Sequence, residues 1–404
     1  FDTVATQAAA GKIDKMKSEF ESWINDDQSR VGGLVSLSHA QPPRWVHRQY
    51  DGDYLTTPGV SKDWSWRPHQ KRVVARIVQS GNTYMAHAVG SGKTSATIGA
   101  AMEMRRLGLV RKPMFVVPNH MLGQFAKEFY EQYPLAKIAV ADSEKFHTST
   151  RKQFVANVAQ DDLDAIITTH TAFGLIPISD EFQAHLIQRQ IDQLHEALAG
   201  LDKQQDRITI KKIENAIEKM EQKLSRRGAK DQVSTFEEMG VDFLFVDEAH
   251  KFRKLDFATR QNLKGIDPNG SNMAWDLYSK VQYLEGNAPG RSAVLASGTP
   301  VTNTMGELYS LSRYLQEKEL EKRGIEHFDS WSSTFGDTRT KLEQRPDGNY
   351  AEVTRFAKLV NVPELYKMVA QVMDVVTPSQ LEQYVVRPKL KGGKRIFHLA
   401  PKSE

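Results

Sequence analysis

The sequence has no cysteine among its 404 residues, which excludes disulfide bonds and metal sites built from thiolates. It also lacks any run of about 20 apolar residues, the length that a membrane-spanning helix needs. No signal-peptide pattern follows the first residue, Phe1, and the chain opens without a methionine. We therefore expect a cytoplasmic segment of a longer protein, with no membrane partner.

An excess of charge of one sign is also missing. Lys and Arg number 54 against 50 Asp and Glu, and the formal net charge is +4. This mild basicity permits a nucleic-acid partner without requiring one. The hydrophobic content of 40% over this length is enough for two or more packed domains.

One stretch, residues 86–94, carries most of the recognisable chemistry and reads Ala-His-Ala-Val-Gly-Ser-Gly-Lys-Thr. A predicted strand at 82–85 precedes it and a predicted helix at 95–104 follows, which is the context of a phosphate-binding loop. Backbone N–H groups and the positive end of the helix would bind phosphate. In this pattern Lys93 reaches the β- and γ-phosphates of ATP and Thr94 holds Mg²⁺. The residues expected at the nucleotide are Val89, Gly90, Ser91, Gly92, Lys93, Thr94 and Ser95.

This stretch, called the phosphate loop below, departs from the full pattern at one position. His87 stands six residues before the lysine, where the pattern has glycine. Taken alone, the stretch could also be a strand, turn and helix that merely contains Gly-Ser-Gly.

A second motif follows a predicted apolar strand at 241–246. The strand runs directly into Asp247-Glu248-Ala249-His250, called the acidic box below. Asp247 is expected to hold Mg²⁺ through its water shell, and Glu248 to polarise the attacking water as a general base. General bases contribute roughly 100- to 10,000-fold to a rate. The expected catalytic set is thus Lys93, Asp247 and Glu248, although an acidic pair after a strand can also be an ordinary turn.

Two further motifs flank these. Trp66-Arg67-Pro68-His69-Gln70 opens a predicted helix ahead of the phosphate loop, and the Gln70 amide can bond an adenine edge as donor and acceptor together. We therefore expect Arg67 and Gln70 beside the nucleotide. Ser297 and Thr299 follow a predicted strand at 292–296. With His250, they are expected to relay the state of the nucleotide through hydrogen bonds.

Further predicted strands at 113–118, 137–141 and 164–169 alternate with helices. This alternation predicts an α/β fold, a parallel sheet with helices on both faces. Ligands collect at the carboxyl ends of such strands, where Lys93, Asn119 and the Thr169-His170 pair would emerge.

Residues 180–227 have a different pattern. Apolar residues at three- and four-residue spacing form two seams, over 187–201 and 210–224, that are out of phase with each other. One helix cannot present both, so we predict a helical hairpin turning at 202–206, with arms zipped like a short coiled coil. Its mixed surface charge favours a structural insertion or a protein partner over nucleic acid.

In this order, the motifs resemble the first half of a superfamily-two helicase of the DEAH type. They look most like the Swi/Snf-like branch of DNA translocases. The resemblance implies a RecA-like lobe that uses ATP and Mg²⁺ and tracks along double-stranded DNA. It further implies DNA-backbone contacts from two loops, for which donors suffice. His120 and His170 could equally be ordinary loop residues, and the matching positions are Asn119, His120, Gln124, Thr169 and His170.

The resemblance covers 66–404 apart from the insertion. In this family a second RecA-like lobe supplies arginine fingers, which are worth roughly 1,000- to 100,000-fold in related NTPases. No later helicase motifs follow here, so we expect a segment that binds ATP but turns it over poorly. The expected division begins with an N-terminal extension (1–62), helical over 4–26 and irregular over 26–62. It continues with lobe one in two parts (63–178 and 236–316), the hairpin insertion (179–235), and a helical region with a linker towards the second lobe (317–404).

The flanking sequence resembles large phage- or plasmid-borne proteins that join a DNA methylase to such a translocase. This implies a bacterial, phage or plasmid origin and association with the nucleoid. Two alternatives remain open. The chain could be a nucleotide-regulated module that binds DNA or recruits a protein partner through the hairpin, or it could be a helicase that separates strands.

Overall fold

The computed structural model describes residues 15–40, 48–142, 146–199, 210–222 and 235–384, with short gaps inside these ranges. The expected hairpin turn at 202–206 and the linker-like end at 385–404 lie outside the described residues. The chain forms two units, one of residues 50–194 with 211–404 and one of residues 1–49 with 195–210.

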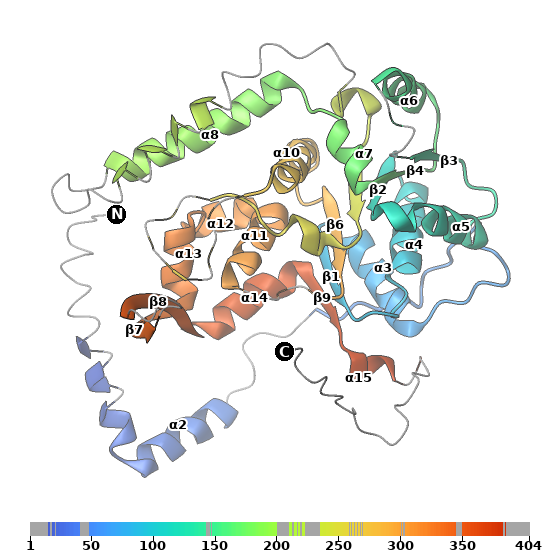
Figure 1. Ribbon diagram of the computed structural model, residues 1–404. Coiled ribbons are helices and arrows are strands. Elements are labelled where there is room, and N and C mark those ends of the chain that lie inside the picture. The colour runs from blue at the N-terminus through green and yellow to red at the C-terminus, as the bar shows by residue number, and fades with distance from the viewer. Residues whose placement is uncertain are drawn as a thin grey trace, which may run out of the picture. The chain divides into compact units, whose positions relative to one another are not determined.

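The larger unit is built on one parallel sheet of seven strands in the order β3-β4-β2-β5-β6-β1-β9 (Figure 1). The strands are short and, towards the centre of the sheet, fully buried, as expected when helices cover both faces. Their bounds are β1 (Thr83–His87), β2 (Pro113–Val117), β3 (Ile138–Ala141), β4 (Ala165–Thr169), β5 (Phe243–Val246), β6 (Ala293–Ser297) and β9 (Met373–Val376).

The two faces of the sheet are covered by different helices. Alternate residues such as Phe115, Ile167 and Phe245 pack with helices α3 (Pro68–Ser80), α4 (Lys93–Arg106) and α5 (Leu122–Gln132). The other face meets α7 (His170–Leu175), α10 (Asn272–Asn287) and α11 (Met305–Leu315) (Figure 1). The α/β fold expected from the alternation of strands and helices, a parallel sheet with helices on both faces, is confirmed (Figure 1).

The strands place their carboxyl ends at one edge. In the register, Val117 pairs with Thr169, Val116 with Val246, and Ala86 with Ser297. Because all neighbours run parallel, the loops that follow β1, β2, β4, β5 and β6 emerge together. This is the edge at which the sequence motifs were expected.

The C-terminal part differs from the helical region that the sequence predicted. Helices α12 (Glu317–Arg323), α13 (Phe328–Phe335) and α14 (Val362–Val372) are present, but α13 and α14 enclose an antiparallel hairpin of β7 (Gly336–Gln344) and β8 (Tyr350–Leu359). The strand β9 then joins the main sheet beside β1, and α15 (Pro378–Leu381) follows. The hairpin strands carry no apolar run, since little more than Phe356 packs inward, so hydrophobic patterning gave no strand signal.

The predicted insertion is confirmed as helical where it is described. Its first arm is α8 (Asp180–Ala199), and the described residues within 210–222 are also helical. Ile187 and Ile191 are buried, and Arg189 Nη2 lies 3.3 Å from the Tyr278 hydroxyl and 3.2 Å from Glu317. The middle of α8 therefore packs on α10 and α12, while zipping of the two arms stays a prediction.

In the smaller unit, the described residues within 15–25 are helical, as predicted. The region after them, 26–62, was expected to be irregular. This was wrong over 28–40, where α2 runs from Gln28 to Ala40 through Gly32 and Gly33, whereas residues 48–62 contain only turns and irregular backbone. Glycine costs about 1 kcal/mol relative to alanine inside a helix, which weakens a helix without ending it. Across the described ranges, every helix is too short or too polar to cross a membrane.

The remaining short elements connect these parts. They are α6 (Thr148–Gln160) and the 3₁₀ turns η1 (Asn119–Met121), η3 (Glu237–Met239) and η4 (Ala249–Phe252).

Candidate functional site

The phosphate loop leaves β1 and ends in the first turn of α4. Gly90 and Gly92 have φ of 83° and 78°, which side-chain-bearing residues rarely adopt. Gly92 is followed directly by Lys93, the first residue of α4. The backbone thus takes the turn that a phosphate-binding loop requires, at the positive end of a helix.

The residues of this loop fit a phosphate ligand. The Ser91 hydroxyl is buried and has no hydrogen-bond partner among the described residues. Lys93 Nζ donates to the carbonyl of His87 at 3.2 Å, so the ammonium is held over its own loop. A buried free hydroxyl, a helix N-terminus and a lysine converging on one loop form a donor set suited to an anion.

Two side chains from the start of α3 brace the phosphate loop from outside. His69 Nε2 donates to the carbonyl of Ser91 at 2.7 Å, and burial lowers the pKa of His69. Gln70 Nε2 lies 3.3 Å from the carbonyl of Gly92 and 3.4 Å from the Ser95 hydroxyl. Gln70 Oε1 accepts from the backbone N–H of Arg67 at 2.9 Å. Both the oxygen and the nitrogen of the Gln70 amide are therefore hydrogen-bonded within the protein. A contact of Gln70 or Arg67 with adenine stays a prediction, and for Gln70 it requires that adenine replace one of these partners.

His87, the residue that replaces the expected glycine, joins the loop to β9. Its ring is 1% exposed, and Nε2 lies 2.6 Å from Asp374 Oδ2. The other oxygen of Asp374 lies 3.6 Å from Arg76 of α3. Burial acts to raise the pKa of Asp374, but the bond and charge of His87 and the charge of Arg76 outweigh it, so the net direction is downward.

The acidic box leaves β5 in a strained turn. Glu248 has φ of 49°, a left-handed conformation that is uncommon for a residue with a side chain. Burial raises the pKa of Asp247, and the negative charge of Glu248 raises it further, while Lys93 acts in the opposite direction. The Asp247 carboxylate, with this cost of ionisation and a second acid beside it, is suited to a bound cation, which would relieve that cost.

The described residues contain no cluster of three or more His, Asp or Glu side chains arranged for a metal ion. Thr94 and Asp247 alone would then leave most of the coordination of Mg²⁺ to phosphate oxygens and water. This is how Mg²⁺ is commonly held in ATP sites.

The three residues expected to relay nucleotide state do meet. His250 Nδ1 lies 2.8 Å from Glu248 Oε2 and 3.4 Å from the Ser297 hydroxyl. The Ser297 hydroxyl also accepts from the backbone N–H of Thr299 at 3.1 Å. Tyr84 of β1 joins this group through a hydrogen bond to Ser297, while its burial raises the pKa of Tyr84 to about 12. The acidic box, β6 and β1 are thus linked by one chain of polar contacts.

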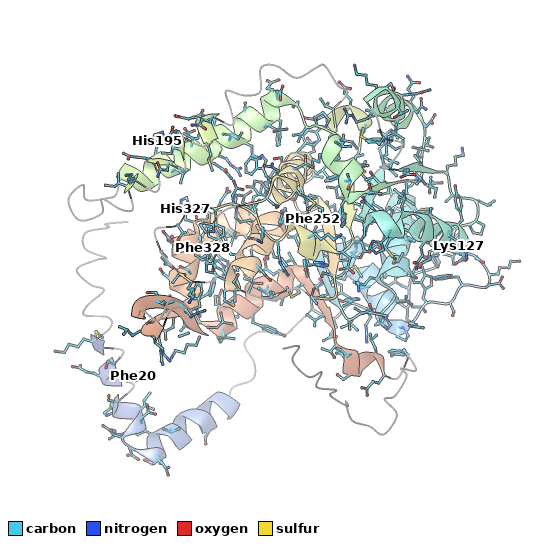
Figure 2. All side chains as sticks on the ribbon, in the orientation of Figure 1. Phe20, Lys127, His195, Phe252, His327 and Phe328 are labelled. Carbon is cyan, nitrogen blue, oxygen red and sulfur yellow. The ribbon has the colours of Figure 1, made fainter. Side chains whose placement is uncertain are left out.

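The five expected DNA contacts separate into two groups. Asn119, His120 and Gln124 are exposed after β2. Thr169 and His170 are buried; the Thr169 hydroxyl caps α7, and His170 Nε2 donates to the carbonyl of Asp247 at 2.9 Å. His170 also packs edge-on against Phe252, which lies in the interior (Figure 2). These two side chains stabilise α7 and the acidic box from the interior. Because both are buried, neither is accessible to DNA in this structure.

Several residues of this site escaped the sequence analysis. Thr171 is exposed and exchanges hydrogen bonds with Asn119 at 3.0 and 3.3 Å, joining the loops after β2 and β4. His69 belongs to the motif at 66–70, in which only Arg67 and Gln70 were given roles. The departure at His87 was a usable signal, whereas nothing in the sequence pointed to Asp374 as its partner.

Comparisons with known proteins find one matching family and two similar proteins. The family described as a probable helicase domain matches residues 76–377, more than half of the 404-residue chain. Defense against restriction protein B of Escherichia phage P1 is 22% identical over 424 residues, covering 93% of this chain and 18% of that protein. The SWI2/SNF2 ATPase core of Sulfolobus solfataricus, solved in complex with dsDNA, aligns at 13% identity with a TM-score of 0.42, over 80% of this chain and 46% of that one.

The chain therefore spans less than a fifth of the length of its phage relative. The family match begins in α3 and ends just past β9. It therefore includes the phosphate loop, the acidic box and the elements from α11 to β9. The chain belongs to the family of probable helicase domains.

Proposed function

We propose that this chain is the ATP-binding lobe of a motor that hydrolyses ATP to move along double-stranded DNA. The observation that carries the proposal is the pairing of the phosphate loop with the acidic box at one edge of the sheet. The charge of Lys93 acts to lower the pKa of Asp247, so the two motifs are near enough to interact electrostatically. The strand β6 lies between them and supplies Ser297, which contacts His250 of the acidic box.

Bound ATP would supply the electrophile, its terminal phosphorus, and Mg²⁺ would offset the charge of the phosphates. The loop from Val89 to Ser95 would cradle the phosphates, with Lys93 neutralising their charge, and Thr94 and Asp247 would hold the metal. Glu248 takes the proton of the attacking water as a general base. His250, bonded to Glu248 and close to Ser297, is placed to report on the state of that base.

A second RecA-like lobe in the longer protein would supply the arginine fingers, so the segment alone is expected to turn ATP over poorly. The phage P1 relative is named for defence against restriction, which makes phage duplex DNA the first substrate to test. A protein partner at the helical insertion is a further part of the proposal, supported by its position outside the sheet.

The decisive experiment measures ATP turnover by the longer protein without DNA, with single-stranded DNA and with duplex DNA, beside Glu248→Gln. Stimulation by duplex that vanishes in the variant supports the proposal. Stimulation by single strands alone would favour a strand-separating helicase. Absence of turnover in all three conditions would favour a nucleotide-regulated binding module.

A companion measurement tests the incompleteness of the segment. Residues 1–404 alone are expected to bind ATP with little DNA-stimulated hydrolysis. Robust stimulated turnover by this segment would contradict the dependence on a second lobe.

A further inference from the structure

His87 departs from the phosphate-loop pattern, which has glycine at this position, and the function proposed above gives its side chain no role. The ring is buried, so it is not open to a ligand from solvent. It instead joins the end of β1 to β9, the neighbouring strand at the edge of the sheet (Figure 1). A buried polar side chain is expected to have a hydrogen-bond partner, and that partner is Asp374.

The bond to β9 joins a buried ring to a carboxylate that is itself held in place. His87 Nε2 lies 2.6 Å from Asp374 Oδ2. Burial acts to raise the pKa of Asp374, but the bond and charge of His87 bring it below its usual value, so the carboxylate is ionised at neutral pH and accepts from the ring. On its other side, Arg76 Nη1 lies 3.6 Å from Asp374 Oδ1, and Arg76 Nη2 donates to the carbonyl of Ala370 at 2.7 Å.

The strand β9 also holds the backbone of His87. The peptide that joins His87 to Ala88 is one rigid plane, with the His87 carbonyl at one end and the Ala88 N–H at the other. That N–H donates to the carbonyl of Val376 in β9 at 2.9 Å. The His87 carbonyl therefore points away from β9, towards the residues after β6, where a Cβ on Gly298 would lie 3.7 Å from its oxygen. This peptide is fixed twice from β9, once through its backbone and once through the side chain of Asp374.

The fixed carbonyl is the one that holds the ammonium of Lys93. Lys93 Nζ donates to it at 3.2 Å. An ammonium has three N–H donors, so this bond does not have to break when phosphate oxygens are bound. The lysine stem is long and flexible, and a fixed acceptor limits the positions that its charge can take before the ligand arrives. Ordering the group in advance reduces the entropic cost of binding.

We propose that Asp374 and His87 are positioning residues for Lys93, which hold its ammonium where the β- and γ-phosphates of ATP bind. The route runs from the Asp374 carboxylate to the ring of His87, and from the carbonyl of His87 to Lys93. Glycine at this position would leave the peptide held from β9 by Val376 alone and would add backbone freedom. The inference rests on the proposed function, because it concerns the same nucleotide site.

The test is equilibrium binding of a non-hydrolysable ATP analogue with Mg²⁺ to the 404-residue chain, titrated to millimolar ligand. Asp374→Ala removes the side-chain anchor of His87. The matched control is Asp164→Ala, because the two carboxylates are similarly exposed, at 24% and 26%. Asp164 accepts from Arg105 Nε and from the backbone N–H of Lys137, both at 2.8 Å, and it precedes β4, at the opposite end of the strands from the phosphate loop.

We expect Asp374→Ala to bind the analogue about three- to ten-fold more weakly, the effect of losing one ordinary hydrogen bond. The control should retain the affinity of the wild type, although both variants should lower the melting temperature. A loss of affinity confined to Asp374→Ala therefore separates positioning from loss of stability.

A second comparison asks whether the effect passes through Lys93. Lys93→Met removes the ammonium and keeps an unbranched stem. In that background, adding Asp374→Ala should change the affinity by less than about two-fold, because interacting residues do not have additive effects. His87→Gln keeps a side-chain N–H donor that can reach Asp374, so it should bind the analogue more tightly than His87→Ala.

Equal affinity of Asp374→Ala and the wild type would overturn this inference and leave the proposed function standing. An equal loss with and without the Lys93 ammonium would also overturn it, because Asp374 would then act on the loop independently of Lys93. Tighter binding by Asp374→Ala would overturn it as well, since the carbonyl of His87 would then compete with phosphate for Lys93. Absence of analogue binding by the wild type would overturn both this inference and the proposed function.

Discussion

The phosphate loop and the acidic box leave the same edge of one sheet, but they work through different parts of the chain. The phosphate loop presents its backbone, shaped by Gly90 and Gly92 and braced from outside by His69 and Gln70. The acidic box presents side chains on a strained backbone, with Glu248 in the left-handed region. We infer that the phosphate loop loses ATP binding when its backbone conformation is disturbed, whereas the acidic box loses ATP hydrolysis when its carboxylates are replaced.

The largest effect is expected from a purely chemical change in the acidic box. Glu248→Gln keeps the size of the side chain and removes the base, so ATP turnover by the longer protein should fall roughly 100- to 10,000-fold. Affinity for ATP, measured by equilibrium binding, should change little. The exposed acid Glu238 lies before β5, outside the box, and Glu238→Gln should leave turnover intact. Equal losses in both variants would contradict the role of Glu248.

The backbone of the acidic box is expected to respond to pH through His170. Burial lowers the pKa of His170 from 6.5 to about 4, so the folded ring stays neutral while the unfolded ring takes up a proton. Stability is therefore lost as the pH falls from 6.5 towards 4, by up to about 3 kcal/mol.

Urea unfolding of the wild type and His170→Asn across this range should show a steeper loss for the wild type. His327→Asn, at a residue whose side chain is 44% exposed, serves as the control. Parallel pH profiles for the wild type and His170→Asn would show that burial of this ring does not drive the acid sensitivity.

The bracing of the phosphate loop by β9 is tested by Asp374→Asn. The change weakens the bonds to His87 and Arg76, and bonds to charged groups contribute about 1.5–3 kcal/mol. Because the pKa of Asp374 lies below its usual 3.8, this contribution is present above that pH and is lost as the pH falls further. Unfolding at pH 7 should show the loss, and the difference between variant and wild type should shrink in acid. A difference independent of pH would argue against the ionised pair.

The smallest effect is expected from alanine at the two glycines of the phosphate loop, Gly90 and Gly92. Alanine at Gly90 or Gly92 costs about 1–2 kcal/mol from the left-handed backbone. At Gly92 the added Cβ would also meet Gln70 Nε2 at 2.4 Å, while at Gly90 it meets open space. Gly92→Ala should therefore weaken ATP binding more than Gly90→Ala. Adding Gln70→Ala to each variant should reduce the difference in ATP affinity between them, because the side chain that the Gly92 Cβ would meet is then removed. Equal affinities for the two single variants would exclude bracing by Gln70.

Most of the sheet could be predicted because its strands are buried on both faces and read as apolar runs between helices. Phe243–Val246 and Ala165–Thr169 are such strands. The hairpin of β7 and β8 could not, because its strands are rich in charged residues and little more than Phe356 packs against a core. The strand β9 was hidden for another reason: it has only four residues and follows α14 without a turn residue, so no boundary signal separates it from the helical region expected there.

By itself the sequence determined the order of motifs, the alternation of strands and helices, and hence which loops meet at one edge of the sheet. These follow from local patterns, since strand polarity and connection rules leave little freedom once the elements are known. Tertiary structure decided which side chains support those loops. His87 meets Asp374 from 287 positions away, and His170 turns inward to the carbonyl of Asp247. Such contacts depend on which surfaces pack together, and no local periodicity encodes them.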